Sequence, residues 1–182
     1  PDPAAADNLF EPIRISLFPA ACAPLNPNWS IIRASVFQLG GDDEGRPLGG
    51  ALLRVIRSED GKLIACGLTD PRGEALIVVP GIPFHNFIPD ERRPGRDDEP
   101  DHDDWMASGD VVEKETSVRL EALVDGGLSW PVDPDALEKN RNTCLCRVTD
   151  GKNGDLAEFL NLKLKTGRTR IISLFVRIPE DT

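Results

Sequence analysis

The alternation of apolar and polar residues predicts a chain of short β-strands. Segments 13–18 and 31–39 alternate strictly, so each predicts a strand with one buried face. Segments 51–57, 63–68 and 74–79 are more continuously apolar and about one strand long, and polar turns join them. Long helical periodicity is nearly absent, so the pattern indicates a mainly β protein.

Two glycine-containing turns separate the three central strands. The first is centred on Asp60-Gly61, a dipeptide typical of hairpins. In the second, Asp70 is suited to accept hydrogen bonds from backbone amides ahead of it, and Pro71 presets φ. Glycine at position 73 is able to adopt positive φ without steric cost. Asp70 and Gly73 are therefore expected to be structural turn residues.

The residues around these turns form a longer pattern. Residues 45–83 contain G-x-P-L-x-G-A-x-L-x-V and then G-L-T-D-x-x-G-E-x-x-I-x-x-P-G. The matching positions are Gly45, Pro47, Gly50, Ala51, Leu53, Val55, Gly67, Thr69, Asp70, Gly73, Glu74, Ile77, Pro80 and Gly81. This order resembles the carboxypeptidase regulatory-like domain, a transthyretin-like (prealbumin-like) β-sandwich. The resemblance implies a module that braces, presents or binds rather than catalyses.

Two enzymatic relatives of that fold depend on tyrosine. Intradiol dioxygenases hold iron with tyrosines and histidines, and hydroxyisourate hydrolases carry a C-terminal tyrosine motif. This chain has no tyrosine and ends in Ile178-Pro179-Glu180-Asp181-Thr182. The resemblance therefore does not imply either activity.

The predicted fold is an antiparallel Greek-key β-sandwich with one short helix and a long acidic loop insertion. Residues 1–12 are expected to be a disordered or extended arm. Residues 13–179 are expected to form one domain, a size that suits 182 residues, with the irregular insertion at about 84–110.

The remaining elements follow from local signals. Segment 111–124 holds a strand, and segment 144–148 suggests a short one. Asp133 is placed to cap a helix over 134–140, with Pro134 at its first position.

The end of the chain predicts a closing hairpin. Residues 160–164 and 172–178 alternate on either side of a turn at 166–168. Its outer face is expected to carry Lys163, Lys165, Arg168 and Arg170. These cations either protect a sheet edge from unwanted strand addition or form a docking patch. The docked partner would be acidic, or the acidic segment of a second copy.

Some predicted strands are apolar on both faces. Leu52 and Ile56 lie on the face opposite Leu53 and Val55, although a sandwich strand normally buries one face. An insertion, the N-terminal strand or a partner subunit is therefore expected to cover the second face.

The charge of the chain excludes some functions. A formal net charge of −10 and a pI of about 4.7 argue against general nucleic-acid binding. No apolar run reaches the roughly 20 residues of a membrane span, and no signal peptide is visible. The sequence starts at Pro1 without methionine, which suggests trimming. The expected location is cytoplasmic, with a secreted or surface location as the alternative.

An acidic cluster lies in the insertion and includes a histidine, His102. Its aspartates are Asp97, Asp98, Asp101, Asp103 and Asp104. They are weak candidates for a Ca²⁺ site, because the spacing matches no EF-hand loop and lacks a glycine. A solvated acidic loop is the favoured interpretation.

Four cysteines are present: Cys22, Cys66, Cys144 and Cys146. Their spacing does not match a zinc site. Half-buried free thiols are expected, and a Cys22–Cys66 disulfide is the alternative.

No motif in the sequence indicates catalysis. The only histidines are His85 and His102, and no nucleophile elbow, P-loop or zinc-protease motif is present. We therefore expect a non-catalytic structural or protein-interaction module without a cofactor, which docks to a larger assembly or self-associates. The alternatives are a carbohydrate- or Ca²⁺-binding module with Trp29, Trp105 and Trp130 as stacking surfaces, and an unrecognised hydrolase.

Overall fold

A computed structural model describes most of the chain outside the insertion. The described residues are 17–20, 22–26, 28–40, 45–83, 85–87, 111–113, 115–126, 131–151 and 154–179. The predicted arm over 1–12 lies outside them. So does the predicted irregular insertion at about 84–110, except for residues 85–87, which form a short strand. Leu17 and Phe18 are the described part of the predicted strand 13–18, and neither lies in a strand.

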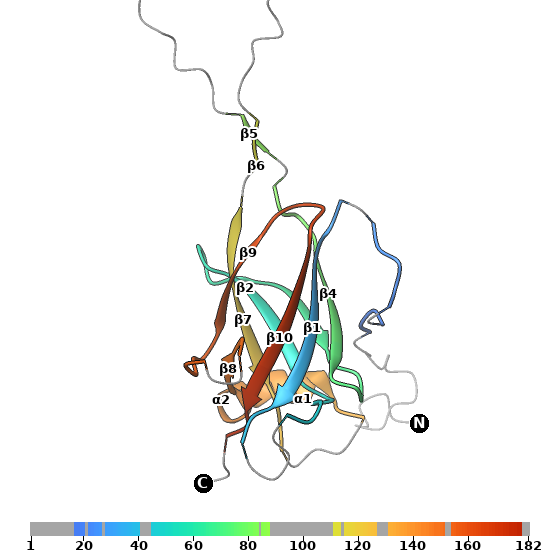
Figure 1. Cartoon of the computed structure of the whole chain (residues 1–182), viewed down its shortest axis with the longest axis vertical. Coiled ribbons are helices and arrows are strands. Elements are labelled where there is room, and N and C mark those ends of the chain that lie inside the picture. The colour runs from blue at the N-terminus through green and yellow to red at the C-terminus, as the bar shows by residue number, and fades with distance from the viewer. Residues whose placement is uncertain are drawn as a thin grey trace, which may run out of the picture.

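Two four-stranded sheets form the body of the molecule (Figure 1). The first sheet has the order β4 (Glu74–Val79), β1 (Ser30–Gln38), β10 (Thr169–Arg177) and β8 (Arg147–Thr149). The second sheet has the order β3 (Leu63–Leu68), β2 (Leu52–Arg57), β7 (Thr116–Leu123) and β9 (Leu160–Leu164). A separate ribbon pairs β5 (His85–Phe87) with β6 (Val111–Glu113). The protein is thus mainly β, as predicted.

A single apolar layer lies between the two sheets. Ile32 and Val36 of β1 and Leu174 of β10 meet Leu53 of β2 and Leu120 of β7, and all five are buried. Every second residue of these strands points into the layer because side chains alternate across a strand. The alternation in the sequence therefore identified the core correctly.

The predicted closing hairpin is wrong. β9 pairs with β7 in the second sheet, whereas β10 pairs with β1 and β8 in the first. The turn does form, with Gly167 at φ 67°, but it carries the chain from one sheet to the other. β10 also runs parallel to β1, from Ile31↔Thr169 to Gln38↔Val176, so the structure is not purely antiparallel.

The second face of β2 is covered within the chain. Leu52 packs with Leu123 and with Leu137 and Cys144 from two short helices, α1 (Pro134–Lys139) and α2 (Arg141–Cys144). The helices were not among the expected covers. One helix was predicted, whereas the described residues form two, so Cys144 is helical and the short strand begins later, at β8.

Local capping explains why α1 begins where predicted. The Asp133 carboxylate accepts a hydrogen bond from the Asp135 amide at 3.0 Å, and Pro134 follows the cap. The carboxylate thereby satisfies an amide that has no partner inside the helix.

Charged groups lie beneath these helices on the outer face of the second sheet. Arg54 of β2 and Glu121 of β7 are cross-strand neighbours, and their side chains are 10% and 7% exposed. Arg54 Nη1 lies 2.6 Å from Glu121 Oε2, and its Nε lies 2.8 Å from Glu138 Oε1 on α1. Arg141 of α2 also reaches Glu121, at 3.0 Å. These ion pairs attach both helices to the sheet.

The second predicted turn forms as expected. Asp70 Oδ1 accepts hydrogen bonds from the amides of Arg72 at 2.9 Å and Glu74 at 3.0 Å. Gly73 has φ 74°, and a Cβ there would lie 2.6 Å from the Val36 carbonyl oxygen. Only glycine therefore fits.

The Thr69 side chain, before this turn, is fully buried. Its hydroxyl donates to the Leu48 carbonyl and accepts from the Ala51 amide, both at 2.8 Å. Thr69 thereby joins the end of β3 to the loop that leads into β2.

All four cysteines are free thiols, so the Cys22–Cys66 disulfide does not form. Burial raises the pKa of Cys146 to about 12, which keeps this thiol protonated and unreactive near neutral pH. Among the described residues, no helix is both long enough and apolar enough to cross a bilayer.

Candidate functional site

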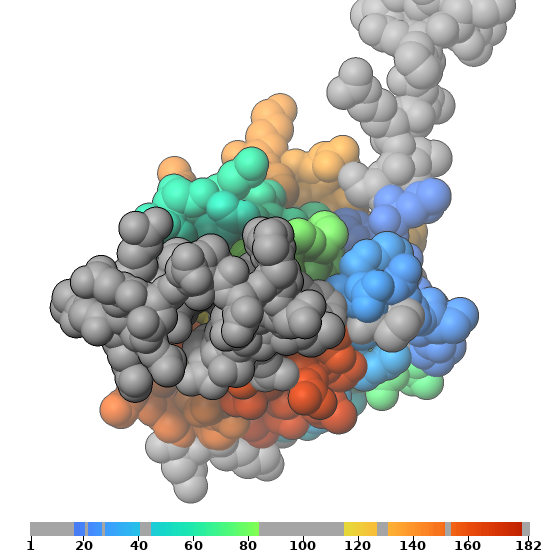
Figure 2. Space-filling view, turned by 90° about the horizontal axis from the view of Figure 1, so that it is seen from above, coloured from blue at the N-terminus to red at the C-terminus, as the bar shows by residue number. Residues whose placement is uncertain are grey.

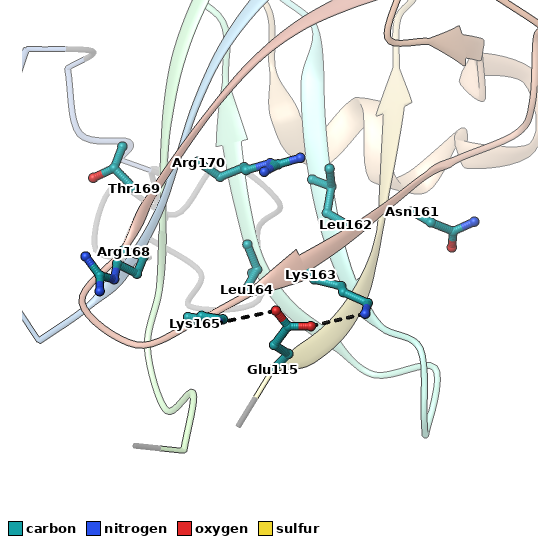
Figure 3. A pocket seen from close by; sticks show the side chains of 9 residues that line it. All are labelled: Glu115, Asn161, Leu162, Lys163, Leu164, Lys165, Arg168, Thr169 and Arg170. Atoms are coloured by element: carbon teal, nitrogen blue, oxygen red, sulfur yellow. Dashed lines mark ion pairs between the residues drawn. The ribbon is translucent and has the colours of Figure 1, made fainter. Parts of the chain in front are cut away.

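A groove opens where β9 and β10 separate into different sheets. It has a volume of about 530 Å³, and we call it the basic groove. Its lining residues are Glu115, Asn161, Leu162, Lys163, Leu164, Lys165, Arg168, Thr169 and Arg170 (Figure 3). The two leucines belong to the core, so the groove reaches the apolar layer at its base.

The basic groove gathers the four cations that the sequence singled out. Lys163 lies on β9, Lys165 and Arg168 flank the turn, and Arg170 lies on β10. The sequence placed all four on one outer face. However, Arg170 has the same strand parity as the buried Ile172, and Figure 3 shows its side chain extending into the groove.

Glu115 is the acidic residue among the described groove residues, and no pattern in the sequence indicated it. One of its carboxylate oxygens lies 3.1 Å from Lys163 Nζ, and the other lies 3.6 Å from Lys165 Nζ. The hydrogen bond from Lys163 and the two nearby charges lower the pKa of Glu115. Glu115 directly precedes β7, which pairs with β9, but this pairing could not be identified from the sequence.

The ends of the insertion lie beside the same groove. The Thr166 hydroxyl in the β9–β10 turn donates a hydrogen bond to the Ile82 carbonyl at 2.5 Å. This bond holds the segment that follows β4 against the turn. The chain re-enters the body at Glu115. Figure 1 shows β5 and β6 at the same end as the β9–β10 connection, with α1 and α2 at the other.

The first sheet brings N-terminal and C-terminal strands of the described chain side by side. In Figure 2 the red C-terminal strands lie beside blue N-terminal residues, as the pairing of β10 with β1 requires. Ile171 of β10 is 76% exposed, so this large apolar side chain lies on the surface.

The other predicted site residues do not form a site among the described residues. Trp29 is 40% exposed. Trp105, Trp130, His102 and the aspartates Asp97, Asp98, Asp101, Asp103 and Asp104 lie outside the described part of the chain. His85 belongs to β5 by its backbone. Within the described ranges, no cluster of histidine, cysteine or acidic side chains is arranged to hold a metal ion.

The chain matches no protein-family model and no curated protein sequence. Its function is therefore inferred from the geometry and charge of the basic groove.

Proposed function

We propose that the chain is a non-catalytic interaction module that binds an acidic segment of a protein partner in the basic groove. Its two-sheet body acts as a rigid support, consistent with the prealbumin-like Greek-key sandwich implied by the sequence. The antiparallel pairings of the second sheet, and those of β1 with β4 and β10 with β8 in the first, support a sandwich of this kind. The parallel pair of β1 and β10 is not an antiparallel Greek-key return.

The observation that carries this proposal is the concentration of positive charge. The whole chain has a formal net charge of −10, yet the described groove residues include four cations and one carboxylate. Opposite charges across an interface guide the approach of a partner and exclude like-charged surfaces. The arrangement therefore favours an acidic protein and disfavours nucleic-acid phosphates as the general ligand of so acidic a chain.

The test is binding of fluorescent polyglutamate to the purified chain, measured by anisotropy at low and at physiological salt. The groove variant carries Lys163→Glu and Arg170→Glu. The control variant carries Lys62→Glu and Lys139→Glu, two exposed positions that change the net charge by the same amount. We expect the groove variant to lose about tenfold or more in affinity for polyglutamate. Each substitution replaces an attraction to the peptide carboxylates by a repulsion.

Equal losses in the two variants would refute the proposal, because the effect would then follow net charge alone. A peptide copying residues 96–105 is measured in parallel, since these residues supply the acidic cluster of a second copy. Groove-dependent binding of this peptide, with sedimentation showing association at low salt, would identify the partner as another copy of the chain.

A further inference from the structure

One side of β10 is unpaired over much of its length. β1 pairs with this strand from Thr169 to Val176, whereas β8 pairs with its other side only at Phe175–Arg177. Among the described strands, none pairs with residues 169–174 on that side. The basic groove lies at the start of this open edge.

The backbone hydrogen bonds show which groups the open edge presents. The Ile31 amide donates to the Arg168 carbonyl at 3.0 Å, and the Leu39 amide donates to the Val176 carbonyl at 2.8 Å. Even-numbered residues of β10 therefore direct their backbone groups toward β1. Because consecutive residues of a strand alternate in direction, odd-numbered residues direct theirs the other way. The open edge thus presents the N–H and C=O groups of Thr169, Ile171 and Ser173.

The side chains beside this edge differ between the two faces of the sheet. On the outer face Ile171 is 76% exposed. On the inner face Arg170 extends into the basic groove, which is also lined by Lys163 of β9 and by Lys165 just after this strand. An added strand would alternate its side chains between these two environments. Apolar residues would cover Ile171, and acidic residues would meet the cations.

We infer that the open edge of β10 binds the partner by strand addition, and that the bound segment is an extended peptide in which acidic and apolar residues alternate. The inference rests on the proposed docking function and specifies the form of its ligand. Main-chain hydrogen bonds to Thr169, Ile171 and Ser173 supply affinity, as in other complexes of this kind. The cations and Ile171 select the sequence of the added strand.

The competing explanation is that the cations protect the edge from strand addition. Charged side chains on an edge discourage pairing with apolar strands or with like charges. They do not repel a strand that carries carboxylates at every second residue. The two explanations therefore differ in one measurable outcome, the binding of an alternating acidic strand.

The probe is a capped peptide of about seven residues, one strand in length, that alternates glutamate with valine. Two analogues carry N-methyl groups, one on the odd and one on the even peptide nitrogens, and a third replaces glutamate with lysine. An added strand presents only alternate N–H groups to its neighbour. We expect one N-methylated analogue to lose about tenfold or more in affinity, since several hydrogen bonds are removed, while the other binds like the parent. The lysine analogue should not bind.

The protein side of the contact is tested by Ile171→Pro. The Ile171 amide faces the open edge, so proline removes a donor that β1 does not use. This variant should lose affinity as the sensitive analogue does, whereas Ile171→Thr, which keeps the amide, should lose less. On the unaltered protein, peptide binding should slow hydrogen exchange at the amides of Thr169, Ile171 and Ser173, a measurement that does not depend on the proline variant folding.

The outcomes separate this inference from the proposed function. If both N-methylated analogues bind like the parent and exchange at these amides is unchanged, strand addition is refuted, although groove-dependent polyglutamate binding would still support docking. If polyglutamate also binds independently of the groove cations, both are refuted.

Discussion

Replacing Glu121 by leucine tests whether the buried ion pairs hold the helices to the second sheet. The substitution leaves Arg54, whose side chain is only 10% exposed, facing Glu138 alone. Removing one partner of a buried pair costs about 3–5 kcal/mol because the remaining charge stays poorly solvated. The free energy of unfolding of a typical domain is about 5–15 kcal/mol, so this loss is on the order of a third of it.

A double-mutant cycle separates the ion pair from simple loss of packing. Arg54→Met alone leaves Glu121 with Arg141 at 3.0 Å, so it should cost less than Glu121→Leu. The double variant removes both buried charges, and we expect a coupling energy of about 1–3 kcal/mol. The matched control is Arg57→Met in the same strand, whose pair with Asp60 is 35% and 43% exposed, and it should cost about 0–1 kcal/mol.

The assay is urea unfolding followed by far-ultraviolet circular dichroism, with the free energy of unfolding extrapolated to water. If the two single substitutions add within about 0.5 kcal/mol, the charges are not coupled and the reasoning is wrong. A cost for Arg57→Met as large as that for Arg54→Met would likewise show that burial is not the cause.

Two further predictions concern turns. Gly73→Ala should destabilise the fold by about 2–4 kcal/mol, because it adds strain at φ 74° and a Cβ 2.6 Å from the Val36 carbonyl oxygen. Gly81→Ala has the same φ and no heavy atom within 4 Å of the added Cβ, so about 1 kcal/mol is expected; equal shifts in melting temperature would refute the steric argument. Burial raises the pKa of Asp70, but the hydrogen bonds that its carboxylate accepts within the turn lower this pKa by more. The folded pKa therefore lies below its ordinary value of about 4. Ionised Asp70 therefore stabilises the fold above that value, and the stabilisation is lost as the pH falls through the folded pKa. Asp70→Asn should reduce the acid sensitivity of the melting temperature, and an unchanged pH profile would contradict this.

The local elements could be predicted because their signals are local. The Asp60-Gly61 hairpin forms, with the Arg57 amide donating to the Lys62 carbonyl at 2.9 Å. The cap at Asp133 and the glycine at position 73 likewise depend on neighbours a few residues away. Each signal reflects a hydrogen bond or a steric limit within one turn of chain.

The candidate site could be predicted only in part. The spacing of Lys163, Lys165, Arg168 and Arg170 indicated a cluster, and the structure brings them to one groove. The contribution of Glu115 could not be predicted, since it depends on β7 lying beside β9.

In the strands that alternate strictly, such as β1, the sequence by itself determined which residues face the core, because a period of two assigns each side chain to one face of a strand. It did not determine which strands are neighbours, because every residue offers the same backbone donor and acceptor and many pairings bury the same apolar face. The parallel pairing of β1 with β10, more than a hundred residues apart, was decided by the packing of the two sheets around their shared layer. The groove and the open edge exist only because that packing separates β9 from β10.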